Sequence, residues 1–134
     1  MSCNSAIYTA NTTPQELLGS AQIPFGTIIR RFGRFANLDG FGITLCAPGY
    51  YKCDCSATLS PAATGNVSVQ LYVNGDPYPG AIATGYSASG NPITLSFPAI
   101  VRLKGCADSS ATLAIRIGDS AATVTNMAFS VEKI

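Results

Sequence analysis

Histidine is absent from this 134-residue chain, and charged residues make up only 11% of it, against roughly 25% in a typical soluble protein. Without histidine, the side chain that most often serves as a general base near neutral pH is missing. The net charge of +1 provides no electrostatic footprint for nucleic acid or for an anionic membrane. No apolar run reaches about 18 residues, so no membrane-spanning helix is predicted.

The scarcity of charge also bears on the surface, which Ser, Thr, Asn, Gly and small apolar groups must largely cover. Such a surface is typical of a protein that is partly hidden in an oligomer, although a neutral polar exterior alone also fits. The N-terminal residues lack the basic and apolar regions of a secretory signal peptide. We therefore expect synthesis in the cytoplasm, and display on a virion or spore surface stays open.

A catalytic constellation is also missing. The acidic residues are spread through the chain without a local pair; they are Glu16, Asp39, Asp54, Asp76, Asp108, Asp119 and Glu132. A cysteine nucleophile would need a base as partner, and only Lys52, Lys104 and Lys133 could serve. We therefore expect no enzyme and no cofactor.

The five cysteines form an odd number, which argues against a closed set of disulfides. Cys53 and Cys55 are the one close pair, and strand residues two apart have Cα atoms about 6.5–7 Å apart, at the outer limit for a disulfide. We interpret both as reduced core residues. A metal site there would need two further ligands, so none is expected. Whether Cys46 and Cys106 approach each other is left open.

The stretch Gly49–Ala81 predicts two strands and the turns that bound them. Apolar residues alternate with polar ones from Tyr51 to Leu59 and again from Val67 to Val73, the period of a strand with one face in a core. Asn74-Gly75 is a strong tight-turn signal after the second strand. Similar alternation, or strand ends marked by Gly and Pro, predicts about eight strands and no long helix, which is typical of an all-β sandwich or barrel.

For three segments the sequence defines the local structure less closely. Residues 93–103 predict one long strand or two strands bent at Pro98. Residues 75–92 are rich in Gly, Pro and Ser and predict turns and short edge pieces. Residues 1–22 read as a polar N-terminal arm before a single domain at 23–134, with at most one helical turn near Gln15. The predicted core is Ile43, Leu45, Tyr51, Cys53, Cys55, Leu59, Val67, Val69, Leu71, Leu95, Phe97, Val101, Leu113, Ile115, Ile117, Phe129 and Val131.

Arg30, Arg31 and Arg34 form the single basic cluster of the sequence. One interpretation is a contact with an anion or phosphate. The other is an edge or interface strand whose arginines pair with acids, for which the candidates are Asp39, Asp54 and Glu132. We favour the second interpretation, because three arginines in a nearly neutral chain make no extended patch.

The order Cys46-Ala47-Pro48-Gly49-Tyr50-Tyr51, an alternating strand and then NVSVQLYVNGDPYPGA resembles the centre of the trimeric jelly rolls of the complement-q and tumour-necrosis-factor superfamily. AIVRLKGCADSSATLAIRI and NMAFSVEKI are similar to the later strands of that family. The resemblance covers residues 25–134. It is closest to the bacterial form, the C-terminal domain of collagen-like exosporium glycoproteins and its relatives in phages and prophages.

This resemblance implies a jelly-roll sandwich of two antiparallel sheets, like that of tumour necrosis factor, and a homotrimer. The implied function is that of a structural or interaction protein on a phage or spore surface, whose partners are its own copies and a surface protein or glycan. The chain departs from the family at Cys106, where an acidic residue is usual after Gly105, and it has no Gly-x-y stalk before the domain. No ligand is therefore transferred.

The resemblance also implies which strands meet around the threefold axis. In the family, the closing strand, the strand before it and the strand that begins near Tyr50 share one sheet, and its outer face packs between subunits. Small residues there let sheets approach closely, and an aromatic residue is of the kind enriched at interfaces. The predicted trimer interface is Tyr50, Thr112, Ala114, Arg116, Asn126, Ala128, Ser130 and Glu132. We expect Arg116 and Glu132 to pair with each other or across subunits.

A carbohydrate-binding module is the alternative function. Lectin jelly rolls bind sugars through exposed aromatic side chains and polar loops. Tyr72, Tyr78 and Tyr86 lie in or near predicted loops and are the candidate ligand contacts. The same side chains could instead cover apolar surface or fill a contact between subunits.

Overall fold

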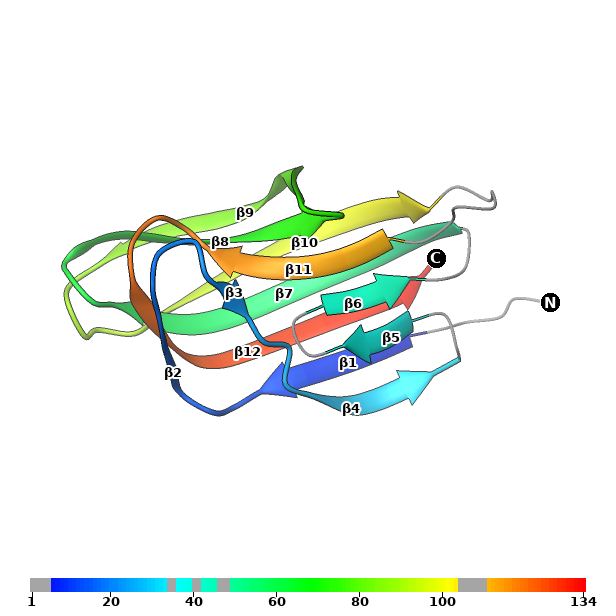
Figure 1. Ribbon diagram of the computed structural model, residues 1–134, viewed down its shortest axis with the longest axis horizontal. Helices are drawn as coiled ribbons and strands as arrows, with labels where there is room; N and C mark the ends of the chain where they lie inside the picture. The colour runs from blue at the N-terminus through cyan, green and yellow to red at the C-terminus, as the bar shows by residue number, and fades with distance from the viewer. Residues whose placement is uncertain (1–5, 34–35, 40–41, 46–48, 104–110) are drawn as a thin grey trace.

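The computed structural model describes residues 6–33, 36–39, 42–45, 49–103 and 111–134, and these form two antiparallel sheets stacked face to face (Figure 1). Sheet A has the strand order β10-β7-β12-β1-β4, with β2 paired to β12, and sheet B has the order β5-β6-β11-β8-β9, with β3 paired to β11. Sheet A comprises β1 (Ala6–Asn11), β2 (Gln15–Leu17), β4 (Thr27–Phe32), β7 (Gly49–Pro61), β10 (Ile93–Leu103) and β12 (Ala122–Lys133). Sheet B comprises β3 (Gln22–Ile23), β5 (Ala36–Asp39), β6 (Gly42–Leu45), β8 (Gly65–Val73), β9 (Asp76–Ser87) and β11 (Ala111–Ile117).

The core lies between the two sheets and follows the alternation of the strands. In β7, the side chains from Tyr51 to Leu59 are buried at every second position, and those between them face outward. Every residue of the predicted core is buried. Because a period of two leaves one face of a strand apolar, each sheet can bury that face only against the other. The expected jelly-roll sandwich of two antiparallel sheets is confirmed.

The N-terminal residues differ from the expectation of an irregular polar segment. Residues Ala6–Asn11 form β1, which lies between β12 and β4 inside sheet A. Ile7 is buried, and Thr9 is buried with its hydroxyl donating to the carbonyl oxygen of Phe129 at 3.3 Å. The suggested helical turn is absent, because Gln15–Leu17 forms β2.

The prolines within β9 and β10 lie on edge strands, where a sheet tolerates them. β9 is a 12-residue edge strand that contains Pro77 and Pro79, so the expected short pieces are joined into one strand. β10 is likewise continuous through Pro98 and is an edge strand of sheet A, whereas β9 is an edge strand of sheet B. An edge strand has one unpaired side, where a missing N–H costs no ladder hydrogen bond.

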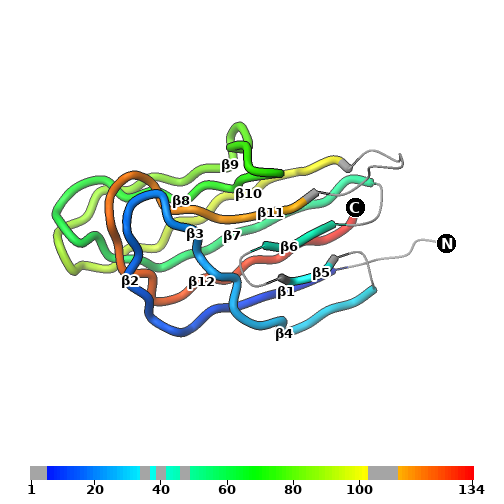
Figure 2. Tube along the Cα trace, viewed as in Figure 1, coloured from blue at the N-terminus to red at the C-terminus, as the bar shows by residue number. Residues whose placement is uncertain are grey.

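The predicted turn after β8 is a two-residue hairpin loop. Asn74 and Gly75 have φ angles of 54° and 86°, the left-handed pair that a hairpin of this length needs and that Asn-Gly adopts readily. Val73 therefore pairs with Asp76, and β8 continues into β9. β1 begins and β12 ends at the same end of the sandwich (Figure 2).

Candidate interaction surfaces

The outer face of sheet A is built from rows of side chains that cross five strands. One row holds Ser130 with Tyr8 on one side and Asp54 on the other. The next row toward the middle of the sheet holds Ala128 between Ala10 and Ser56. Since cross-strand neighbours on one face lie about 4.5–5.5 Å apart, small residues make the middle of this face low.

Large apolar side chains rise around that low centre. Tyr8 is 41% exposed, Tyr50 51%, Ile100 56% and Phe32 66%. Their cross-strand registers place Phe32 on β4, at one edge of sheet A, and Ile100 on β10, at the other edge. Exposed apolar side chains gathered on one face mark an interaction surface more often than scattered ones do.

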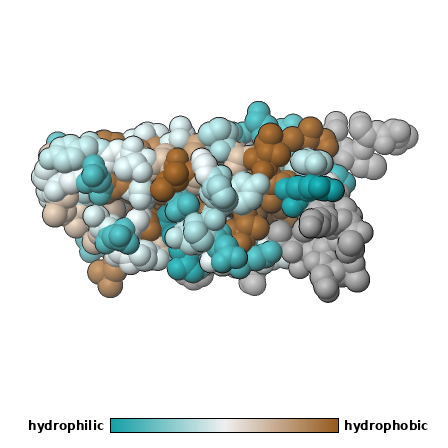
Figure 3. Space-filling model, turned by 90° about the horizontal axis from the view of Figure 1, so that it is seen from above, coloured by the Kyte–Doolittle hydropathy of each residue, from teal (hydrophilic) through white to brown (hydrophobic). Residues whose placement is uncertain are grey.

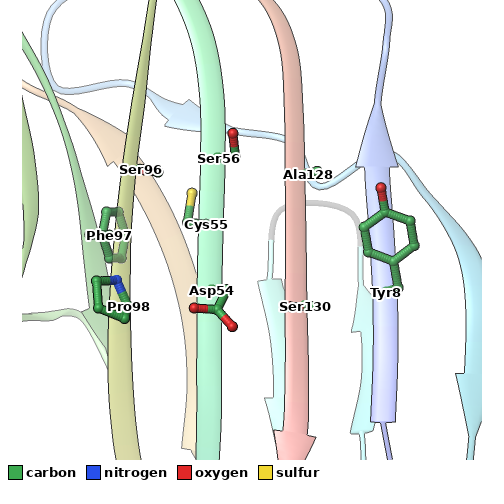
Figure 4. Close-up of a pocket in the computed structure, with 9 residues that line it drawn as sticks. All are labelled: Tyr8, Asp54, Cys55, Ser56, Ser96, Phe97, Pro98, Ala128 and Ser130. Atoms are coloured by element: carbon green, nitrogen blue, oxygen red, sulfur yellow. The ribbon is translucent and has the colours of Figure 1, made fainter.

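Two of the hollows along sheet A lie beside Tyr8. The larger has a volume of about 450 Å³ and runs between the ring of Tyr8 on β1 and residues Phe97 and Pro98 on β10 (Figure 4). Its other lining residues are Asp54, Cys55, Ser56, Ser96, Ala128 and Ser130. The smaller hollow, of about 340 Å³, lies along β1 and β4 and is lined in part by Tyr8, Arg30, Phe32 and Glu132. A flat sheet face would lack such relief, so this face is shaped to receive protruding groups.

The structure separates the residues of the predicted trimer interface. Five of them lie on strands of sheet A, where they face outward; these are Tyr50, Asn126, Ala128, Ser130 and Glu132. The other three, Thr112, Ala114 and Arg116, lie on β11, which belongs to sheet B. The expectation that β11 and β12 share a sheet is wrong, because β11 pairs with β6, β3 and β8. Arg116 and Glu132 are thus on opposite sheets, which prevents the expected pairing within one chain.

Each outer face carries one arginine stacked on a tyrosine. On sheet B, the guanidinium carbon of Arg116 lies 5.0 Å from the centroid of the Tyr72 ring. On sheet A, Arg102 lies 5.6 Å from the centroid of the Tyr50 ring. Attraction between a cation and the face of an aromatic ring favours both arrangements.

The candidate ligand tyrosines do not form one site. Tyr72 and Tyr86 both point outward from sheet B, Tyr72 opposite Ala114 and Tyr86 opposite Asn66. Tyr78 is half-buried against the core, and its hydroxyl donates to the carbonyl oxygen of Ile100 at 2.5 Å. The hydroxyl of Tyr78 therefore links β9 to β10. Tyr72 and Tyr86 remain candidates for a ligand contact, because they lie on an open face.

The basic cluster lies on an edge strand. Arg30 and Arg31 belong to β4, the edge of sheet A, and both are exposed. Arg34 and the side chain of Asp39 are outside the part of the chain that the structure describes. Within the described part, neither Arg30 nor Arg31 forms an ion pair with Asp54 or Glu132. The edge position matches the favoured interpretation. Of the expected ion pairs, those of Arg30 and Arg31 with Asp54 or Glu132 are not formed, and those with Arg34 or Asp39 stay predictions.

Cys53 and Cys55 are buried free thiols on the inner face of β7. Burial raises the pKa of each thiol from 9.0 to about 12, because the apolar core disfavours the thiolate, and the neighbouring charges of Asp54 and Cys53 add to the effect. A thiol with such a pKa is a poor nucleophile near neutral pH. Cys3, Cys46 and Cys106 lie outside the described residues.

Among the residues described, no group of three or more Cys, Asp and Glu side chains is arranged to hold a metal ion. The same part of the chain contains no helix long and apolar enough to cross a membrane.

No model of a known protein family matches the chain, and no curated protein matches it by sequence. Solved structures match it in shape. Murine APRIL at pH 5.0 superposes with a TM-score of 0.78 at 11% identity, over 98% of this chain and 99% of that one. The globular domain of zebrafish complement 1qA protein gives 0.72 at 11% identity, over 95% and 94% of the two chains. PRD1 vertex protein P5 gives 0.58 at 14% identity, over 97% and 96%.

These likenesses show the fold, which is the jelly roll of tumour necrosis factor and the complement-q globular head. They extend over nearly the whole of both chains, so the N-terminal β1 belongs to the shared architecture. At such low identity the side chains of the faces differ, and the function must be argued from the surfaces of this chain.

Proposed function

We propose that this chain is a non-enzymatic structural and interaction module, which assembles as a homotrimer through the outer face of sheet A and binds a partner with its remaining surface. The observation that carries the proposal is the relief of that face. Small side chains such as Ala128 and Ser130 form its centre, while Tyr8, Phe32 and Ile100 protrude around them.

A ring of three needs a contact between two different patches, since each subunit touches one neighbour on each side. Sheet A offers two different edges, with Phe32 and Arg30 on β4 and Ile100 and Arg102 on β10. The hollow between them receives protruding side chains of the next copy. Charge within this face is partly balanced already, because Glu132 lies directly across from Lys52. Burying such a neighbouring pair costs less than burying either charge alone.

The proposed interface retains Tyr50, Asn126, Ala128, Ser130 and Glu132, and it gains Tyr8, Phe32 and Ile100. Thr112, Ala114 and Arg116 lie on sheet B and are not part of it. The proposed setting is a phage or spore surface. The resemblance of the sequence to bacterial and phage jelly rolls supports that setting, as does the fold shared with PRD1 vertex protein P5.

Light scattering of the purified protein tests the assembly. We expect a mass close to three chains of 13.8 kDa, and a stable monomer at micromolar concentration would contradict the trimer. Two variants form a matched pair. Ser130→Arg places a long charged side chain in the centre of the sheet A face, and Thr84→Arg places the same side chain on the exposed face of β9, an edge strand of sheet B.

The carbohydrate-binding alternative also has an observation in its favour. Tyr72 and Tyr86 face outward from sheet B, away from the proposed trimer contact. An aromatic side chain on an open sheet face suits the apolar side of a sugar ring. A glycan array on the recombinant protein tests this function, and the absence of any bound glycan would count against it.

A further inference from the structure

Arg116 stands in the middle of sheet B, where it projects from the outer face of β11. Its direct cross-strand neighbours are Gln70 on β8 and Gln22 on β3. The guanidinium lies over the ring of Tyr72 at 5.0 Å from the centroid. Stacking on the ring and flanking side chains on both sides hold the guanidinium in one place.

The position of this guanidinium is fixed, but it has no hydrogen-bond partner among the residues that the structure describes. Among the residues that the structure describes, its Nε is a buried nitrogen that donates to no acceptor, and no acceptor is found for its terminal nitrogens. A buried N–H without a partner is rare in folded proteins and requires an explanation. Because Nε is covered, the two terminal nitrogens are the atoms that remain for a ligand.

Arg116 is the one charged residue among the described outward side chains of β8 and β11. The other outward side chains of β8 and β11 are neutral; they are Asn66, Ser68, Gln70, Tyr72, Thr112 and Ala114. Exposed Ile82 lies across from Gln70 on β9 and adds an apolar side chain beside the charge. The face thus combines one fixed cation with amides, hydroxyls and an apolar group.

We propose that this patch binds an acidic saccharide, with the carboxylate of one sugar on the terminal nitrogens of Arg116. Two parallel N–H groups of a guanidinium match the two oxygens of a carboxylate, and such charge-assisted pairs are the strong hydrogen bonds of proteins. The amides of Gln70 and Gln22 can both donate to and accept from sugar hydroxyls. Ile82 offers contact for the C–H face of the ring.

The neutrality of the patch favours a saccharide over an acidic peptide. A run of acidic side chains would bring several charges to a face that neutralises one, and the others would lose hydration without a partner. A sugar with a single carboxylate and many hydroxyls matches the ratio of one guanidinium to several neutral polar groups. This inference deepens the proposed function and rests on its partner-binding part, and it does not require the trimer.

Isothermal titration calorimetry of the full chain with trigalacturonate and with sialyllactose tests the site. We expect at least one of these carboxylate sugars to bind, and its neutral counterpart, trigalactose or lactose, to bind about tenfold more weakly or not at all. Arg116→Gln should weaken binding by about tenfold or more. Arg116→Lys, which keeps the charge but loses the paired donors, should also weaken it.

Arg102→Gln is the matched control, because it removes the same charge from the same kind of stack, on Tyr50 of sheet A. Arg102 borders the proposed trimer contact, but the site on sheet B lies within one chain, so Arg102→Gln should leave binding of the short sugars unchanged whatever it does to assembly. Wild-type protein that binds neither acidic sugar, an Arg116→Gln variant that binds like wild type, or tighter binding of hexaglutamate would each overturn the inference. Circular dichroism of every variant shows that the fold is kept.

Light scattering on the same samples separates this inference from the proposed assembly. If the protein is a monomer and binds acidic sugar through Arg116, the proposed site is correct and the proposed trimer is wrong. If it is a trimer and binds no acidic sugar, the trimer is correct and the site is wrong. In a ring closed by sheet A, the three copies of sheet B face outward, so a polymeric acidic glycan should bind more tightly than its trisaccharide.

Discussion

At the scale of single residues, Leu71 shows how strongly the core depends on the assigned strand faces. It has no exposed surface and pairs across the strands with Ile115, which is also fully buried. Leu71→Ala should lower the free energy of unfolding by about 2–5 kcal/mol through the cavity it leaves. Denaturant unfolding at fixed protein concentration measures this. Gln70→Ala, on the outer face of the same strand, should change it by less than about 0.5 kcal/mol, and equal effects would mean the faces are reversed.

The buried thiols of Cys53 and Cys55 predict a pH dependence of stability. Their pKa rises to about 12 in the fold from 9.0, so above pH 9 the unfolded chain loses protons that the folded chain keeps. Stability from these groups is therefore complete below pH 9 and falls as the pH rises toward 12, by about 1.4 kcal/mol per pH unit for each thiol. Unfolding of wild type and of a Cys53→Ala/Cys55→Ala variant between pH 8 and 10 should show the steeper loss in wild type; parallel curves would contradict this.

All five cysteines should also be dispensable for folding. Cys53 and Cys55 are free and pack as small apolar residues. A variant with alanine at all five positions should unfold cooperatively, at reduced stability because the core loses volume. If reductant alone unfolds the wild-type protein, a structural disulfide exists and this expectation is wrong.

At the scale of the element, β1 is a central strand and should tolerate proline poorly. Tyr8 pairs with Ser130 of β12 on one side and with Arg30 of β4 on the other, while its side chain faces outward. Tyr8→Pro removes a ladder hydrogen bond without disturbing the core, and leaving a buried carbonyl unpaired costs about 1–3 kcal/mol. Thermal unfolding should show a clear loss for Tyr8→Pro relative to Tyr8→Ala. Equal melting temperatures would mean that β1 contributes little to sheet A.

At the scale of the whole molecule, the two outer faces should respond differently to the same change. Ser130→Arg should yield a folded monomer near 13.8 kDa, because a charge buried without a partner opposes assembly. Thr84→Arg, on sheet B, should keep the mass of the wild-type protein. A Ser130→Arg variant that stays at the trimer mass would place the contact elsewhere.

Apolar side chains also gather near one end of the edge made by β9 and β10 (Figure 3).

The period of two along the strands is enough to predict an all-β sandwich or barrel and the residues of its core. Alternation is a local property, because each strand residue points opposite to its neighbours whatever the strand pairs with. The faces of β7, β8 and β12 and the turn at Asn74-Gly75 could therefore be predicted without the structure. The strand β1 was not predicted, because its inward positions include the polar residues Thr9 and Asn11. Hydrogen bonds to the carbonyl oxygens of Phe129 and Pro24 make the burial of these side chains possible.

Which strands share a sheet was decided only by the tertiary structure. The side-chain pattern of β11 is the same whether it lies beside β12 or beside β8, since pairing joins residues far apart in the chain. That choice moved Arg116 from the expected trimer interface to the opposite face, and it brought Tyr72 against the guanidinium at 5.0 Å. The sequence by itself therefore determined what each strand buries, while the packing of one sheet on the other determined which outward residues meet.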